Sequence, residues 1–241
     1  MACPAAPIAP KPSSWISANA RRNIIPIAIA LRDQFSASYY RDSFVRMLRA
    51  RDIDCAYIAS GFFSDFLARL AHTAPDFRID EEMEGKSLFL CGGYGEDTTT
   101  LCALRDAFIS RGVKAYANCL PTPISGGKPP RWHAKVAVFL SGTKPVLAIV
   151  GSSNFSTPTM YGSSEHKFTA SPDRVQVEAD SFYWLRSCLD TDQAVHDAFH
   201  YWGSGSLAPH IAFNDEKFDA EIEKMIESTY KRLQSFHWEE L

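Results

Sequence analysis

Residues 133–154 read HAKVAVFLSGTKPVLAIVGSSN, and this stretch decides the fold. Two apolar runs flank the short polar segment SGT, so the stretch predicts a β-hairpin. His133 and Lys135 are two residues apart, and both side chains are therefore expected on one face of the first strand. A histidine and a lysine on an otherwise apolar strand are costly unless they serve a site. The second run ends in GSSN, where small residues allow Asn154 to approach the same point.

Helix and strand patterns alternate ahead of this hairpin. Helices are expected at 38–52, 64–73 and 96–112, and strands at 54–63, 86–93 and 113–120. This order implies parallel strands joined by crossover helices. The sequence therefore predicts an α/β domain with a mixed, mostly parallel central sheet flanked by helices. After the hairpin we expect a strand at 175–185 and a long amphipathic helix within 213–241. The apolar face of that helix holds Phe218, Ile222, Met225, Ile226 and Leu233.

The composition bounds the class of protein. The 241 residues carry 25 basic and 28 acidic side chains, a net charge of -3, which does not favour a nucleic-acid binder. Six scattered cysteines form no CxxC pair, so a zinc ribbon is not expected and a reducing, cytoplasmic location is favoured. The proline-rich residues 1–20 are expected to form a flexible leader before one domain at 21–241. The apolar segment IIPIAIAL is too short to span a membrane.

HAK and GSSN together resemble the signature of the phospholipase D superfamily. That signature is HxK, then four residues and an Asp, and then GSxN shortly after. Two departures are present, because Leu140 occupies the Asp position and the gap before GSSN is longer. The Asp is also missing in a single-motif, nuclease-like branch related to metal-independent restriction endonucleases. The chain is most similar to that branch, and the resemblance implies a phospholipase D-like fold.

The resemblance also implies roles for the motif residues. His133 would attack phosphorus and form a phosphohistidine, and Lys135 and Asn154 would stabilise charge on the phosphoryl oxygens. Ser152 and Ser153 would help to bind the substrate phosphate. Members of the family add a carboxylate that orients the histidine. Here Glu165 has the spacing of compact members, whereas Glu178 has the strand-like context and is favoured. Neither a metal nor a cofactor is implied.

The chain holds one HxK and one GSxN, so the second histidine of the reaction is expected from a second copy in a homodimer. By analogy with small single-motif members, the favoured activity is endonucleolytic cleavage of nucleic acid, including restriction-type cleavage of DNA. One alternative is a hydrolase of phospholipids or other phosphodiesters, which predicts an apolar lip near the site. Another is a non-catalytic module that binds nucleic acid or a protein.

Other motifs allow two interpretations each. His196 and His200, in HDAFH, suggest a zinc motif without its glutamate, or two histidines of an amphipathic helix that face aromatic neighbours. CGGYGEDT resembles a phosphate loop but is more typical of a tight turn that borders the site. Trp132 could stack on a base or cap the core. The basic residues near the motif, which could contact backbone phosphates, are Lys128, Arg131 and Lys144.

Overall fold

The computed structural model describes residues 27–33, 39–64, 66–67, 83–92, 98–121, 132–160, 177–201 and 217–241. The strands are β1 (Ile27–Asp33), β2 (Cys55–Ser60), β3 (Ser87–Gly92), β4 (Lys114–Cys119), β5 (Lys135–Ser141), β6 (Lys144–Gly151), β7 (Val177–Trp184) and β8 (Glu239–Glu240). The helices are α1 (Tyr39–Arg49), α3 (Thr99–Ile109), α4 (Thr157–Met160), α5 (Leu189–Tyr201) and α6 (Lys217–Gln234). The expected leader and most of the helix predicted at 64–73 lie outside the described residues.

The strands form one eight-stranded sheet in the order β1-β7-β6-β5-β2-β3-β4-β8. The α/β class is confirmed, but the prediction of a mostly parallel sheet is wrong. Only the β2–β3 and β3–β4 pairs are parallel, and the remaining pairs are antiparallel. The parallel part is the segment whose alternating helices and strands were recognised in the sequence.

The antiparallel part follows from short connections. β5 and β6 are joined by a tight turn at Gly142, whose φ of 57° suits glycine, and a hairpin can pair its strands only antiparallel. β5 then lies antiparallel beside β2, and β7 pairs antiparallel with β6. β1 was not expected from the sequence and closes this side of the sheet against β7.

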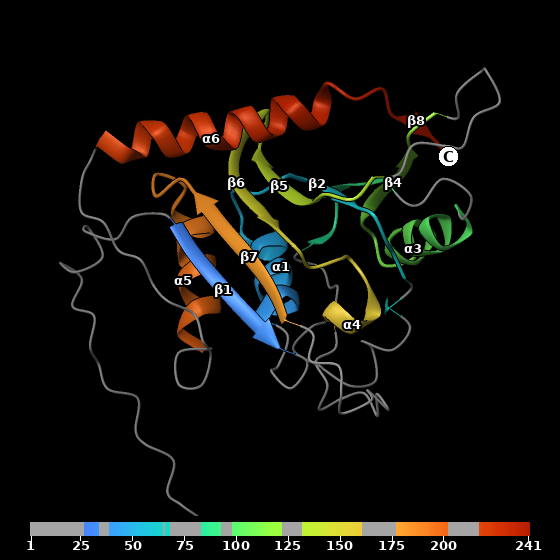
Figure 1. Cartoon of the computed structure of the whole chain (residues 1–241), viewed down its shortest axis with the longest axis horizontal. Coiled ribbons are helices and arrows are strands. Elements are labelled where there is room, and N and C mark those ends of the chain that lie inside the picture. Colours follow the sequence, from blue (N-terminus) through green and yellow to red (C-terminus); the bar gives the residue numbers. More distant parts are fainter. Residues whose placement is uncertain are drawn as a thin grey trace, which may run out of the picture.

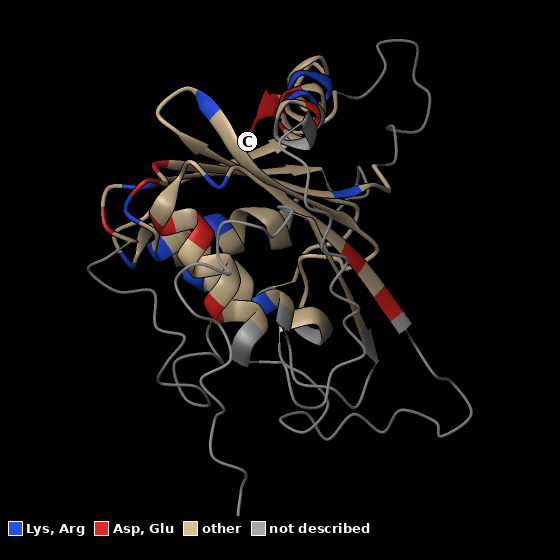
Figure 2. Cartoon of the chain, turned by 90° about the vertical axis from the view of Figure 1, so that its left-hand side faces the viewer, with Lys and Arg blue, Asp and Glu red and all other residues tan. Residues whose placement is uncertain are grey.

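Helices cover the sheet on both faces (Figure 1). On one face, Phe139 of β5 packs against Phe44 of α1, with ring centroids 6.0 Å apart. On the other face, Tyr57 of β2 meets Tyr230 of α6 at 5.4 Å. Figure 2 shows the sheet between α6 and the helices of the opposite layer. The reacting residues of the predicted site therefore have to lie at an edge of this sandwich, because its interior is filled by apolar side chains.

α6 confirms most of the predicted amphipathic face. Ile222, Ile226 and Leu233 are buried, whereas Met225 is 44% exposed and lies outside the core. No helix in the described part of the chain is long and apolar enough to cross a membrane.

Candidate active site

The predicted motif residues meet at one edge of the sheet. Lys135, the first residue of β5, pairs with Gly151, the last residue of β6. β2 lies antiparallel on the other side of β5, so its final residue, Ser60, reaches the same edge. β7 begins there as well and brings Glu178 next to the end of β6. The hairpin thus unites HAK with GSSN, as the sequence predicts.

His133 does not lie on the strand as expected, because β5 begins two residues later. Its side chain is nevertheless beside Lys135, whose Nζ is 3.3 Å from His133 Nδ1 and donates to the His133 carbonyl oxygen at 2.7 Å. An ammonium group has only donors, so Nδ1 acts as the acceptor in this contact. A neutral His133 in this state therefore carries its proton on Nε2.

The segment that carries His133 is held from two sides. Trp132 packs against Phe236 and Trp238 of the C-terminal segment, with ring centroids 4.9 Å and 5.3 Å away. This contact favours the core-capping interpretation of Trp132. On the sheet side the backbone passes so close to Gly61 that a Cβ there would lie 2.3 Å from the Trp132 oxygen. Glycine is needed at residue 61 because the chain that leads into His133 occupies the space of a side chain.

Gly92 makes a second close approach at this edge. Its φ is 120°, and a Cβ there would lie 2.3 Å from the Ser60 oxygen and 3.2 Å from Trp132 Cδ1. The expectation that CGGYGEDT borders the site is confirmed for this glycine, while residues 93–97 lie outside the described part of the chain.

Asn154 is anchored by a residue that the sequence analysis missed. Ser60 Oγ lies 3.3 Å from Asn154 Oδ1 and accepts a hydrogen bond from the backbone N–H of Phe155 at 3.1 Å. Ser60 is 1% exposed. No motif in the sequence links Ser60 to the site, because the link arises only when β5 pairs with β2.

Glu178, the favoured carboxylate, contacts the GSSN turn. The Ser152 hydroxyl donates to Glu178 Oε2 and accepts from the backbone N–H of Ala179 at 2.9 Å. Glu178 therefore helps to hold the GSSN turn through Ser152, and its role in orienting His133 stays a prediction. Glu165, the other possibility, lies outside the described residues.

Ser153 points away from the edge and into the protein. It is 1% exposed, and both its hydroxyl and its backbone N–H donate to Asp180, at 2.6 Å and 3.2 Å. The expectation that Ser153 binds substrate phosphate stays a prediction, and it requires the hydroxyl hydrogen to leave this buried carboxylate. Asp180 was not singled out from the sequence, although it follows Glu178 at the two-residue spacing that puts both on one face of β7.

Asp180 also explains the glycine of GSSN. A Cβ at residue 151 would lie 1.9 Å from Asp180 Oδ1 and 2.4 Å from the Ala179 oxygen.

Tyr40 of α1 is a buried phenol close to Asp180. Burial raises the pKa of the Tyr40 hydroxyl, and the nearby charge of Asp180 raises it further, so this phenol stays protonated.

Leu140, at the position of the family aspartate, is 3% exposed and sits in the core. It is five residues along β5 from Lys135, or about 16 Å at the rise of a strand. Lys144 is likewise at the far end of the hairpin and pairs with Glu223 of α6 at 2.6 Å, so it does not contribute to this edge. Lys128 and Arg131 lie outside the described residues.

The HDAFH motif is in α5 and does not join the site. His196 lies 3.5 Å from Asp192 and packs edge-on against the Trp184 ring, which agrees with an amphipathic helix facing aromatic neighbours. Among the described residues, no group of His, Cys, Asp and Glu side chains has the arrangement of a metal site.

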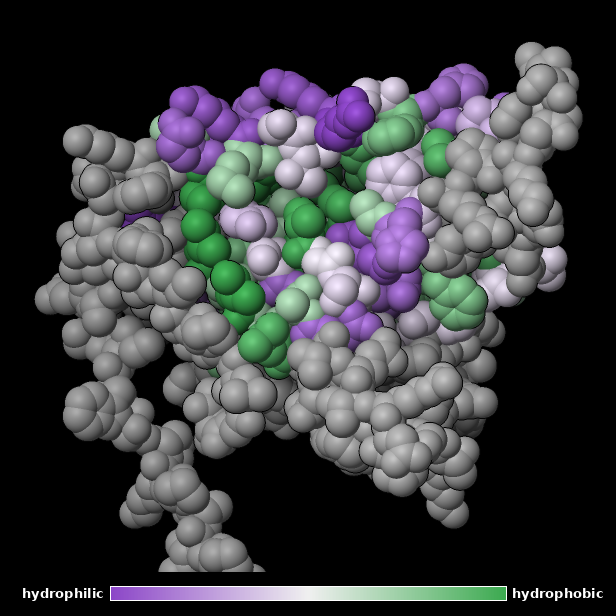
Figure 3. Space-filling model, viewed as in Figure 1, coloured by the Kyte–Doolittle hydropathy of each residue, from purple (hydrophilic) through white to green (hydrophobic). Residues whose placement is uncertain are grey.

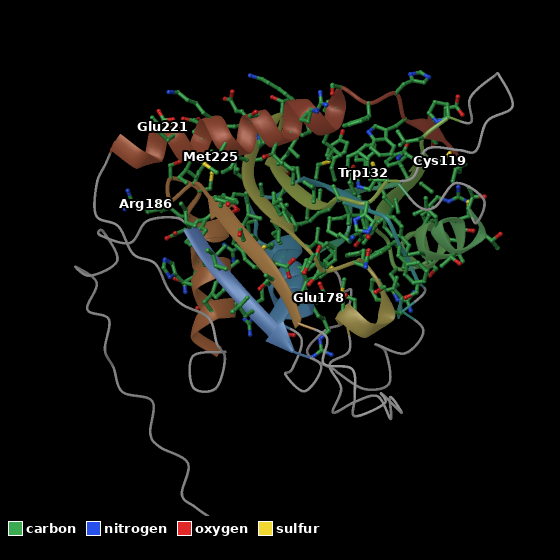
Figure 4. The ribbon with its side chains drawn as sticks, in the orientation of Figure 1. Cys119, Trp132, Glu178, Arg186, Glu221 and Met225 are labelled. Atoms are coloured by element: carbon green, nitrogen blue, oxygen red, sulfur yellow. The ribbon has the colours of Figure 1, made fainter. Side chains whose placement is uncertain are left out.

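A groove of about 820 Å³ opens beside His133, between α6 and the β5–β6 hairpin. Most of its lining is apolar, and Arg232 adds a positive charge near the histidine. Figure 3 shows apolar surface gathered below α6, and Figure 4 shows Trp132 and Met225 near the underside of this helix, with Glu178 at the start of β7. The main apolar residues of the lining are Trp132, Val136, Val150, Met225, Leu233 and Phe236.

No family model and no curated protein matches the chain. Among solved structures, NucT from Helicobacter pylori is similar with a TM-score of 0.33 and 12% identity, over 73% of this chain and 94% of NucT. The polyphosphate kinase from Porphyromonas gingivalis is similar with a TM-score of 0.36 and 13% identity, over 86% of this chain and 31% of the kinase.

Because both TM-scores are below 0.5, neither likeness carries an argument about this chain. The resemblance to the phospholipase D superfamily rests on the HAK and GSSN motifs and on the geometry around them. The main structural feature behind this resemblance is the pairing of Lys135, in HAK, with Gly151, in GSSN. The β5–β6 hairpin brings the two motifs together at its open end.

Proposed function

We propose that this chain is a metal-independent phosphodiesterase of the phospholipase D type, with nucleic acid as its substrate. The observation that supports this most directly is the pairing of Lys135 with Gly151, which brings an imidazole, an ammonium group and a carboxamide to one edge of the sheet. These are the groups needed to attack phosphorus and to neutralise its oxygens.

In the proposed reaction, His133 attacks phosphorus through a ring nitrogen. A P–N bond forms, the bond from phosphorus to the leaving oxygen breaks, and the product is a phosphohistidine. Lys135 and Asn154 donate hydrogen bonds to the phosphoryl oxygens as their charge grows. Water then attacks the phosphohistidine, which breaks the P–N bond and restores the imidazole.

A second histidine is proposed to protonate the leaving oxygen. The chain has a single HxK, so this histidine comes from His133 of a second copy related by a two-fold axis. Subunit mixing tests this step. Wild-type and His133→Ala subunits are mixed and allowed to exchange at constant total protein. If each site needs His133 from both copies, the activity is proportional to the square of the wild-type fraction. A linear fall would show that each subunit works alone.

The activity itself is tested with single- and double-stranded DNA and RNA in the presence of EDTA. We expect cleavage by the wild type and none by His133→Ala or Lys135→Ala. Lys144→Ala is the matched control, because Lys144 lies at the opposite end of the same hairpin. Cleavage that survives His133→Ala, or that needs a divalent metal, would contradict the proposed chemistry.

The apolar groove supports a second candidate, hydrolysis of a phospholipid or another phosphodiester that carries an apolar group. An apolar lip was the feature expected for such a substrate, and the groove adjoins His133. Phospholipid vesicles assayed beside the nucleic acids decide between the two. Release of a headgroup or phosphatidate that depends on His133 and is lost in Val150→Asp would favour the lipid, because Val150 lines the groove and is 37% exposed.

A further inference from the structure

Ser60 reaches the candidate site from β2, 94 residues before its partner Asn154. We propose that Ser60 is a positioning residue that fixes the orientation of the Asn154 carboxamide, so that its NH2 group faces the substrate phosphate. This inference rests on the proposed function, because it assigns Asn154 a donor role in that reaction.

The hydrogen bonds around Ser60 determine which atom of Asn154 can face it. Ser60 Oγ accepts from the backbone N–H groups of Phe155 at 3.1 Å and Phe62 at 3.3 Å. A hydroxyl oxygen has two lone pairs, and these two bonds use both. The Asn154 NH2 group therefore finds no acceptor at Ser60, and the atom that faces it has to be the amide oxygen.

The single hydroxyl hydrogen of Ser60 has two acceptors within reach, the Phe62 carbonyl oxygen at 2.8 Å and Asn154 Oδ1 at 3.3 Å. The Phe62 oxygen is the nearer of the two, so the hydrogen bond to Oδ1 is the weaker one, and the amide oxygen faces Ser60 chiefly because the NH2 group has no acceptor there. With Oδ1 turned toward Ser60, Nδ2 points to the other side of the carboxamide, where it has no hydrogen-bond partner among the described residues. That is the orientation a phosphoryl oxygen requires, since the amide oxygen would repel it.

Ser60 is well suited to hold this orientation. It ends a strand that is paired on both sides, and it is 1% exposed. Its carbonyl oxygen is packed against Gly92 so closely that no side chain fits there. The sheet therefore fixes the position of the Ser60 hydroxyl, and the hydroxyl in turn fixes the orientation of the Asn154 carboxamide.

A double-mutant cycle tests the inference in the phosphodiesterase assay. We expect Asn154→Ala to lower kcat on the order of a hundredfold, as for loss of one donor to a developing oxyanion. Ser60→Ala should lower kcat about tenfold, the loss of one oriented hydrogen bond, with little change in KM. The double variant should be no slower than Asn154→Ala, and Ser60→Thr, which keeps the hydroxyl, should recover most of the activity. Losses that multiply in the double variant would overturn the positioning role.

A second measurement keeps the inference separate from the proposed function. The side-chain NH2 signals of Asn154 in a 15N NMR spectrum are identified by their loss in Asn154→Ala. We expect one sharp pair in the wild type and a broadened or doubled pair in Ser60→Ala. If the wild type cleaves no phosphodiester, the proposed function fails and this spectrum still decides the role of Ser60. An Asn154 amide that is unchanged in folded Ser60→Ala would overturn it.

Discussion

Gly61 gives the sharpest test of how the site is built. A Cβ added there would lie 2.3 Å from the Trp132 oxygen and 3.4 Å from His133 Cα, and real Cβ contacts are essentially never shorter than 3.0 Å. Gly61→Ala therefore has to move the backbone before His133 by about 0.7 Å, the difference between 2.3 Å and 3.0 Å. Because a misplacement of about 1 Å costs up to roughly a hundredfold in rate, we expect kcat to fall on the order of 30-fold, or about 2 kcal/mol.

The matched control is Gly142→Ala, at the turn of the hairpin that carries the site. Gly142 has a φ of 57° and no atom within 4 Å of an added Cβ, so this variant should lose about 1–2 kcal/mol of stability and keep its kcat. Both variants are assayed for phosphodiester cleavage in EDTA and for unfolding in urea. If Gly61→Ala keeps the wild-type kcat, or if Gly142→Ala loses as much, the close approach does not position His133.

Three further perturbations test the surroundings of the site. Gly151→Ala would place a Cβ 1.9 Å from Asp180 Oδ1, and we expect a loss of about 3 kcal/mol in urea unfolding, from overpacking and from weaker bonds to the carboxylate. Lys144→Ala should change stability by less than about 1 kcal/mol, because its pair with Glu223 is 51% and 40% exposed. Burial raises the pKa of Cys91 from 9.0 to about 12, because the buried site favours the neutral thiol. The stability that comes from keeping this thiol neutral is fully present below pH 9 and is lost as the pH rises toward 12. Cys91→Ala should flatten the fall in that range by at most about 1.4 kcal/mol per pH unit in a urea series.

The sequence predicts the local pairings of this fold well and the distant ones poorly. The parallel β2–β3–β4 unit and the β5–β6 hairpin both follow from periodicity and turn residues. The insertion of β5 beside β2, and of β1 beside β7, depends on contacts between residues about 80 to 150 positions apart. No local pattern carries that information, and for this reason the sheet was expected to be mostly parallel.

The site shows the same division. His133, Lys135 and Asn154 were found because they form a motif, and the hairpin brings their segments together. Ser60 and Gly61 were missed because only the β2–β5 pairing makes them neighbours of the motif. Ser153 was assigned to the phosphate because of its place in GSSN, whereas alternation along the turn buries it against Asp180.

These hydrogen bonds limit how the site can meet an anion. The hydroxyl hydrogens of Ser152 and Ser153 are already held by Glu178 and Asp180, so neither donates to a phosphate without first breaking a bond to a carboxylate. The ammonium of Lys135 uses two of its three hydrogens on Nδ1 and on the carbonyl oxygen of His133, so one hydrogen is left to donate to a phosphoryl oxygen. In the proposed reaction Nε2 needs its lone pair to attack phosphorus, so the nucleophilic His133 carries its proton on Nδ1 and cannot accept from Lys135 at that atom. The histidine of the second copy, which protonates the leaving oxygen, has to be the imidazolium, because a neutral ring that lost its Nε2 proton would be left as an imidazolate. Both nitrogens of an imidazolium are donors, so the contact between Lys135 and Nδ1 has to break in each copy before that copy can act.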